Sequence, residues 1–191
     1  SVVPSSNRNV GNLTITGLVQ KVMEESGSAA LTYIRSRARV LGISNEMFQE
    51  VDIHVHIPEG GIPKDGPSAG ITMATSMVSA LTKIPVKSEV AMTGEITLQG
   101  RVLPIGGLKQ KLIAAHRAGI KTVLISKENE KDLVAVPKAV KKSMDIICLE
   151  HMDDVLKHAL SVDPDKLFQN IDEVGSTNLS DEKLEIARHP V

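Results

Sequence analysis

Two residues of this chain have the chemistry to break an amide bond together: a serine in the run PKDGPSAG and a lysine in the run GGLKQK. The serine is Ser68. A serine hydroxyl is a poor nucleophile until a neighbouring base accepts its proton. A lysine amine can be that base where an apolar site disfavours its charged form. The two runs therefore predict an amide-cleaving enzyme with a Ser-Lys dyad.

The residues around Ser68 match the pattern G-x-S-x-G of a nucleophile elbow, with Gly66 and Gly70 as its glycines. A serine at such a place is more often the N-cap of a helix, which requires no chemistry. The two glycines, however, allow a substrate chain to approach the backbone closely. Backbone N–H groups at the start of the following helix could also hold a tetrahedral oxyanion. These features favour a nucleophile over an N-cap.

An esterase with a Ser-His-Asp triad is an alternative that the same pattern allows. In that class the serine turns sharply off the end of a strand, whereas residues 63–67 here separate the predicted strand from Ser68. Pro67 also fixes φ directly before the serine. The histidines that could complete a triad, none of them in a distinctive setting, are His116, His151 and His158. We therefore rank the triad below the dyad.

Two lysines of the run GGLKQK compete for the role of base, Lys109 and Lys111. At 100° per residue, Lys111 lies between Ala115 and Ala118 on the helix wheel. Lys109 lies beside His116, towards the polar side. A lysine on an apolar face often extends to water, but the small neighbours of Lys111 leave room for another element. The pattern predicts Lys111 as a base aimed at the interior and Lys109 as a solvated residue.

Hydrophobic periodicity predicts the elements that hold these residues. The segment 51–57 alternates between apolar and polar residues, as a half-buried strand does. The predicted strands cover 13–16, 51–57, 90–92, 96–105, 122–125 and 145–149, with a tight turn at Gln99-Gly100. The predicted helices cover 18–41, 68–82, 108–118, 128–136 and 152–160. An early hairpin and a late β-α alternation predict an α+β (mixed α/β) fold, with a mixed β-sheet and packed helices.

Composition limits the classes of partner. The 191 residues are 41% hydrophobic, enough for one core, and the net charge of −1 gives no reason to expect nucleic acid or a membrane surface as partner. Aromatic residues make up only 2%, so stacking platforms for bases are not expected. No apolar run approaches the ~18 residues of a membrane span. Residues 1–161 are predicted to form one domain, and the acid-rich residues 162–191 a loosely packed polar tail.

Two histidines, His54 and His56, lie on one face of the predicted strand 51–57, a spacing that metal ligands can have. A zinc site needs at least three protein ligands, and the sequence offers no third residue at this place. We therefore predict no metal site.

Three segments, PKDGPSAG, MTGEITLQGRVLPIGGLKQK and LIAAHRAG, together resemble the proteolytic domain of the ATP-dependent Lon protease family, LonA type. The resemblance extends from about residue 14 to about residue 160. It implies a serine endopeptidase that works through an acyl-enzyme, degrades unfolded or damaged proteins and assembles as a homo-hexamer. In that family the serine of PKDGPSAG is the nucleophile and the second lysine of GGLKxK is the base, which correspond to Ser68 and Lys111.

The resemblance also implies supporting roles for five residues. The threonine of MTGE, Thr93, would orient the lysine amine by a hydrogen bond. Asp65 would help to shape the site, and backbone amides near Gly66 and the serine would form the oxyanion hole. The stretch HVHIPEG resembles a strand of the substrate groove, which implies that His56 and Glu59 lie near the substrate.

Two features depart from the full family pattern. The chain has no GxxxxGK[ST], so we expect no cofactor here, and ATP and Mg²⁺ only in an AAA+ module absent from this chain. An amino-terminal strand pair is expected to be shortened or missing. The chain is therefore interpreted as an excised protease domain from bacterial cytoplasm or, as an alternative, from the mitochondrial matrix. A catalytically silent ring-assembly module of the same fold is the second function that remains open.

Overall fold

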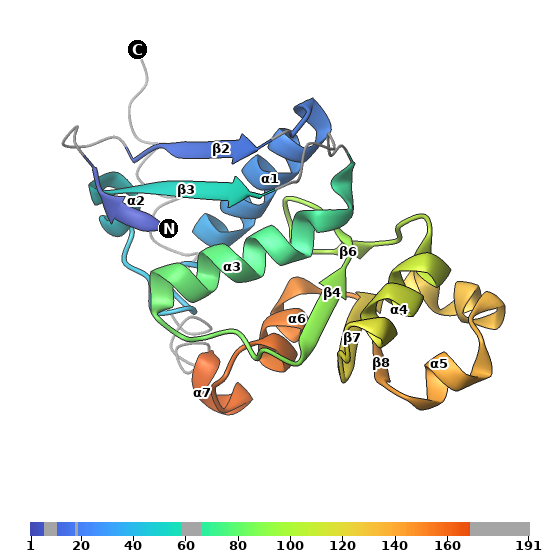
Figure 1. Ribbon diagram of the computed structural model, residues 1–191. Coiled ribbons are helices and arrows are strands. Elements are labelled where there is room, and N and C mark those ends of the chain that lie inside the picture. Colours follow the sequence, from blue (N-terminus) through green and yellow to red (C-terminus); the bar gives the residue numbers. More distant parts are fainter. Residues whose placement is uncertain (6–10, 18, 59–65, 169–191) are drawn as a thin grey trace, which may run out of the picture.

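Two three-stranded sheets and a short hairpin, with helices packed on them, make up the computed structural model (Figure 1). It describes residues 1–5, 11–17, 19–58 and 66–168. Within these residues, no helix is long and apolar enough to cross a membrane. The predicted combination of mixed α/β structure with packed helices is confirmed, although the strands divide into separate sheets.

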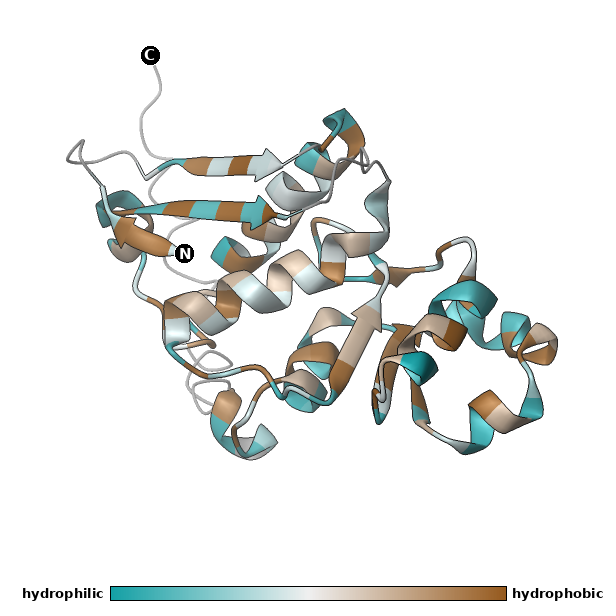
Figure 2. Cartoon of the chain, in the orientation of Figure 1, coloured by the Kyte–Doolittle hydropathy of each residue, from teal (hydrophilic) through white to brown (hydrophobic). Residues whose placement is uncertain are grey.

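The first sheet has the order β1-β3-β2. Its strands are β1 (Val2–Pro4), β2 (Leu13–Gly17) and β3 (Val51–Ile57). The central strand β3 runs parallel to β2 and antiparallel to β1, and hydrophilic and hydrophobic residues alternate along it (Figure 2). The prediction for 51–57 is confirmed. The amino-terminal strands are not missing: β1 has three residues and β2 has five, and each pairs with β3 rather than with the other.

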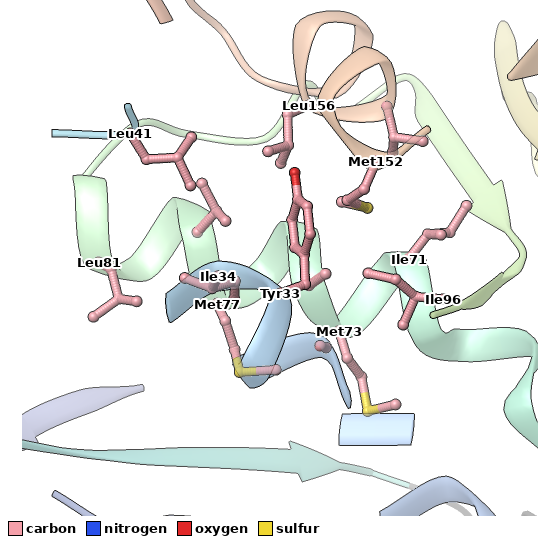
Figure 3. Packing of buried hydrophobic residues seen from close by; sticks show 14 of the residues in the cluster. Tyr33, Ile34, Leu41, Ile71, Met73, Met77, Leu81, Ile96, Met152 and Leu156 are labelled. Carbon is pink, nitrogen blue, oxygen red and sulfur yellow. The ribbon is translucent and has the colours of Figure 1, made fainter. Parts of the chain in front are cut away.

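Helices α1 (Lys21–Arg37) and α3 (Gly70–Thr82) contribute much of the main hydrophobic cluster. Figure 3 shows how Tyr33 and Ile34 of α1 lie among Ile71, Met73 and Met77 of α3. The predicted helix 18–41 is shorter in the structure, because turns replace the helix after Arg37 and continue to Gly42 at φ 68°. A short helix α2 (Met47–Glu50) then leads into β3.

The second sheet is parallel, in the order β4-β7-β8. Its strands are β4 (Val90–Thr93), β7 (Thr122–Ser126) and β8 (Asp145–Leu149), close to the predicted bounds. Successive side chains of a strand point to opposite faces. Val123 and Ile125 accordingly belong to one hydrophobic cluster and Leu124 to the other. The sheet thus separates the main cluster from a second, smaller one.

Helix α4 (Leu108–Arg117) packs in the second cluster through Leu108 and Leu112. Helix α6 (Met152–Ala159) packs in the main cluster on the other side (Figures 1 and 3). The segment that carries Ser68 directly precedes α3, which packs in the main cluster. A Ser-Lys pair between these segments must therefore bridge two separately packed parts of the molecule.

Two predicted elements differ in the structure. The strands predicted over 96–105, with a turn at Gln99-Gly100 between them, are present as a hairpin but are short: β5 (Glu95–Ile96) and β6 (Val102–Leu103). The helix predicted over 128–136 is the 3₁₀ helix η2 (Lys127–Ala135), followed by the short helix α5 (Lys138–Lys142). Pro137 interrupts the helical path between η2 and α5, which apolar periodicity alone does not reveal.

The hairpin turn packs against a buried tyrosine. Gly100 has φ 85°, and a Cβ there would lie 2.5 Å from the Tyr33 ring, so the position requires glycine. The Tyr33 hydroxyl donates a hydrogen bond to Asp153 of α6, which also pairs with Arg37. Burial raises the pKa of Tyr33 above its ordinary value, and the hydrogen bond to Asp153 raises it further. The hydroxyl therefore remains a donor that joins α1 to α6.

The packed domain extends beyond residue 161. Helix α7 (Pro164–Leu167) follows α6, and the side chains of Leu167 and Phe168 are buried in the main cluster. The prediction of a loosely packed tail from residue 162 therefore does not hold for these two residues. The remainder of that predicted tail, residues 169–191, lies outside the described residues.

We predict that Ser26→Ala raises the free energy of unfolding by about 1 kcal/mol. Among the described residues, the Ser26 hydroxyl is the buried side-chain group with no hydrogen-bond partner. The same substitution at Ser126 is expected to lower the free energy of unfolding by about 1–2 kcal/mol, because that hydroxyl donates to Val102 O at 2.9 Å. Urea denaturation of both variants measures the difference, and destabilisation by Ser26→Ala would contradict the prediction.

Candidate active site

The structure brings together the two residues predicted to form the dyad. Lys111 Nζ lies 3.4 Å from Ser68 Oγ, close enough for the amine to donate a hydrogen bond. A contact between base and nucleophile in an unliganded site is often longer than in the reacting complex. Ser68 lies in the 3₁₀ turn η1 (Pro67–Ala69), and Lys111 lies in the first turn of α4. Segments far apart in the sequence thus place a hydroxyl and an amine side by side.

The end of strand β4 holds the backbone of Ser68. The amide of Gly94 donates to Ser68 O at 3.0 Å, and the amide of Ile71 donates to Gly94 O at 3.2 Å. Gly70 approaches the backbone of β5 so closely that a Cβ there would lie 2.8 Å from Ile96 N. A larger residue at Gly70 would therefore push the turn η1, which carries Ser68, away from the hairpin.

Gly66 begins the turn in a conformation that favours glycine, with φ 122° and ψ 155°. A Cβ added to Gly66 would meet nothing within 4 Å, so the requirement for glycine is conformational rather than steric. This backbone bend directs the chain into η1 without a side-chain N-cap. Ser68 therefore does not act as the N-cap of α3, which begins at Gly70.

Thr93 is the last residue of β4 and lies beside Ser68, in the groove that Lys111 also lines. Its buried hydroxyl donates to Ser68 O at 3.2 Å, and its side chain lines the same groove as Lys111. A threonine hydroxyl has one proton and two acceptor positions. Because the proton is used on Ser68 O, Thr93 could interact with the amine of Lys111 only as an acceptor. The expected link between Thr93 and Lys111 stays a prediction.

A groove of about 460 Å³ opens beside the dyad. Its walls come from the start of α3, from β4 and β7, and from one face of α4. Most of the lining side chains are small or apolar: Ala69, Ala91, Met92, Leu112, Ala114, Ala115, Ala118 and Val123. A groove of this composition can accept apolar side chains and exclude water when it is filled.

Lys111 is more exposed than the helix wheel predicts. The wheel places it towards the interior, but in the structure Lys111 and Lys109 are both exposed. The short side chains of Ala114, Ala115 and Ala118 explain the difference, because they leave the groove open above α4 instead of closing it around the amine. The prediction of a buried Lys111 is wrong for the unliganded chain, whereas its proximity to Ser68 is confirmed.

His56 lies away from the dyad. It faces a smaller pocket that His54 and Ser76 also line, and none of these three residues lines the groove beside Ser68. The Thr16 hydroxyl lies 2.7 Å from His54 Nε2 and 2.8 Å from His56 Nδ1. No cluster of three metal-ligating His, Cys, Asp or Glu side chains occurs in the part of the chain that the structure describes. Asp65 and Glu59, predicted to support the site, lie outside the described residues.

The histidines of the alternative triad have other partners. His116 Nδ1 lies 2.7 Å from Ser143 Oγ. His151 bonds to the carbonyl of Gln99 through Nε2 and accepts from the Asp153 amide at Nδ1. His158 lies on α6, and none of the three histidines lines the groove beside Ser68. The geometry therefore favours Lys111 as the partner of Ser68.

Sequence reasoning missed two parts of this arrangement. The amide of Gly94 is not predictable, because any residue type carries a backbone N–H. Asn129, which is 1% exposed, lies in a stretch of charged residues that reads as a solvated surface. A tertiary contact buries its side chain against Ile105, and periodicity carries no signal for such a contact.

The sequence matches the model of the Lon protease (S16) C-terminal proteolytic domain over residues 2–162. Lon protease 1 of Syntrophobacter fumaroxidans is 59% identical over 166 residues, which are 87% of this chain and 20% of that relative. Lon protease of Brevibacillus choshinensis is 60% identical over 154 residues, 81% of this chain and 20% of the relative. Lon protease of Solibacter usitatus is 63% identical over 150 residues, 78% of this chain and 19% of the relative.

This chain spans about a fifth of the length of these relatives. The matched region contains every element of the groove and both residues of the dyad. The family match and the high identities agree with the resemblance carried by PKDGPSAG and GGLKQK. The chain belongs to the Lon protease family, and it corresponds to the C-terminal proteolytic domain of that family.

Proposed function

We propose that this chain is a serine endopeptidase in which Ser68 is the nucleophile and Lys111 is the general base. The distance of 3.4 Å between Lys111 Nζ and Ser68 Oγ is the observation that carries the proposal. The open groove beside the two atoms gives a substrate carbonyl access to Ser68. Family membership supports the reaction class.

In the proposed mechanism, the neutral amine of Lys111 accepts the proton of the Ser68 hydroxyl while Oγ attacks the scissile carbonyl. The tetrahedral oxyanion is held by backbone N–H groups of the turn that precedes α3. The ammonium of Lys111 then gives its proton to the leaving amine, the C–N bond breaks and an acyl-enzyme remains. A water molecule, deprotonated by the same amine, attacks the ester, and the proton returns to Ser68 Oγ as the acid product leaves.

The substrate itself would complete the environment of the base. In the unliganded chain Lys111 is exposed, but the groove around it has mostly apolar walls. A peptide that fills the groove would remove water from the amine, and desolvation disfavours the charged form of a lysine. We further propose that Thr93 accepts a hydrogen bond from this amine. Asp65, Gly66 and Glu59 keep the supporting roles that the family resemblance implies, whereas the implied role of His56 near the substrate has no support from the groove beside Ser68, which His56 does not line.

We also propose that the chain works within a longer protein. The curated relatives are about five times as long as the matched segment. The chain itself has no GxxxxGK[ST] run for ATP. An AAA+ module elsewhere in the full protein would bind ATP and Mg²⁺ and deliver unfolded or damaged proteins to the groove. The same proposal includes a homo-hexamer in the bacterial cytoplasm, since the relatives named above come from bacteria.

We predict that the 191-residue chain hydrolyses a short fluorogenic peptide without ATP, because a short peptide needs no unfolding before it enters the groove. The measurement is the fluorescence released with time, and casein cleavage followed on a gel is the second substrate. A peptide boronate is expected to stop the reaction and to add its mass to Ser68. If the folded chain neither turns over the peptide nor reacts with the boronate, the alternative of a catalytically silent assembly module is favoured instead.

A further inference from the structure

Asn129 lies outside the groove but is connected to the segment that leads into the helix of Lys111. Its side-chain carbonyl accepts from the Ile105 amide at 2.9 Å, and its side-chain amide donates to Ile105 O, also at 2.9 Å. The second amide proton goes to Asp132 Oδ2 at 2.7 Å. The two bonds to Ile105 resemble the pairing of neighbouring strands, although a side chain makes them.

The pairing is specific for the orientation and the chemistry of an asparagine. Rotating the amide by 180° would place its NH₂ against the Ile105 N–H and its oxygen against the Ile105 carbonyl. Asn129 is 1% exposed, so water cannot replace a lost partner without entering the interior. Asp132 fixes the same orientation from the other side. Asn129 therefore holds Ile105 in one defined position.

Ile105 is the place where the chain passes from strand β6 to helix α4. Two glycines follow it, and Gly107 adopts φ 70° directly before the helix. Helix α4 begins without a side-chain N-cap, and the amide of Lys111 bonds to Gly107 O at 3.2 Å. The two glycines bring no side chain that could anchor the start of α4. The bonds of Asn129 to Ile105 therefore hold the chain directly before the first turn of α4, where Lys111 lies.

The second hydrophobic cluster does not remove this dependence. Leu108 and Leu112 bury one side of α4, and η2, which carries Asn129, packs against that helix. Apolar contacts set the distance of a helix from its neighbours but are non-directional. They constrain its rotation and its displacement along the axis less strictly than hydrogen bonds of fixed geometry. A rotation or displacement of α4 would move the Lys111 side chain relative to Ser68.

We propose that Asn129 is a positioning residue of the dyad, which sets the start of α4 through Ile105 and so aims Lys111 at Ser68. The proposal rests on the proposed function of the dyad. The dyad atoms are 3.4 Å apart, at the outer limit of a hydrogen bond, so a small shift of α4 breaks the contact. Displacements of about 1 Å in a catalytic group can lower the rate about 100-fold.

The test uses Asn129→Asp, which keeps the shape of the side chain. One oxygen of the carboxylate would face the Ile105 carbonyl and the Asp132 carboxylate, where a donor now lies. We expect kcat for a fluorogenic peptide to fall about 10- to 100-fold, with KM changed less than about two-fold because the groove walls remain. Val140→Ala is the control. It removes apolar volume from the second hydrophobic cluster, in which α4 packs, and leaves the amide of Asn129 in place.

A structural role and a positioning role give different results. Both variants are compared at a temperature well below the midpoint of unfolding of each. If Asn129 only stabilises the fold, Asn129→Asp and Val140→Ala have the same kcat as the parent under these conditions. If it positions the base, only Asn129→Asp loses kcat. An unchanged kcat in Asn129→Asp, or an equal loss in Val140→Ala, overturns the proposal.

A double-mutant cycle separates this proposal from the dyad itself. The readout is the rate at which a fluorophosphonate labels Ser68, followed by intact mass, which also measures slow variants. If Asn129 acts through Lys111, introducing Asn129→Asp into the parent slows the labelling of Ser68, whereas introducing it into the Lys111→Met variant causes no further slowing. Equal slowing in both backgrounds overturns the positioning role and leaves the dyad intact. Labelling of Lys111→Met at the parental rate instead contradicts the dyad, and the proposal with it.

Discussion

Ser68→Ala is expected to lower peptide hydrolysis by this chain at least ~10⁴-fold, the scale of loss seen when a serine nucleophile is removed. The substitution takes away the one atom that forms the acyl-enzyme in the proposed mechanism. The fold should remain intact, because the backbone of Ser68, not its hydroxyl, is held by Gly94 and Thr93. Turnover of a fluorogenic peptide and the midpoint of thermal unfolding are measured on the same sample.

The matched control for this substitution is Ser88→Ala, since Ser88 is an exposed serine that does not line the groove. It should hydrolyse the peptide at the parental rate. The account would be contradicted by a Ser68→Ala protein that is folded and retains more than a few per cent of the parental activity. Such a result would show that another residue is the nucleophile.

Lys111→Met is expected to lower kcat about 10²- to 10⁴-fold, the usual contribution of a general base. Methionine keeps the length and the apolar part of the side chain and lacks the amine, so it removes proton acceptance with little change of volume. KM should change little, because the apolar walls of the groove remain. Steady-state kinetics with the fluorogenic peptide give both constants.

Lys109→Met serves as the control, because Lys109 lies on the same turn of α4, is exposed, and does not line the groove. It loses the same charge and is expected to keep the parental kcat. Equal losses in the two variants would show that net charge of α4, rather than a base at position 111, affects the rate. A triad would instead require loss of activity on changing His116, His151 or His158, which the dyad does not predict.

The local elements of this chain were predictable because their patterns are local. Strand β3 has the predicted bounds 51–57, since alternation of apolar and polar residues reports one buried face. The choice of Lys111 over Lys109 followed from the helix wheel, and the structure places Lys111 beside Ser68 as that choice required. The elements that carry the two residues pack in different hydrophobic clusters, so apolar patterning did not predict their contact, whereas the chemistry of a serine and a lysine did.

The features that sequence did not reveal depend on tertiary contacts. The exposure of Lys111 arises because no other element of the described chain closes the groove over Ala114, Ala115 and Ala118. A helix wheel reports which side of a helix is apolar but not whether another element covers it. Asn129 is buried against Ile105, which precedes it in the chain by a helix and a strand, and both of its bonds to Ile105 are made with backbone groups. Residue types do not reveal contacts with backbone groups, because nearly every residue carries the same backbone donor and acceptor.

The pH dependence of acylation tests most directly whether Lys111 is the base for Ser68. Single-turnover rates with a peptide ester are measured from neutral to alkaline pH in the parent and in Lys111→Met. A general base acts only in its unprotonated form, so the rate in the parent is predicted to rise with pH and then level off. In Lys111→Met the rate is predicted to be low and to lack this rise. The same rise in Lys111→Met would contradict the assignment of Lys111 as the base.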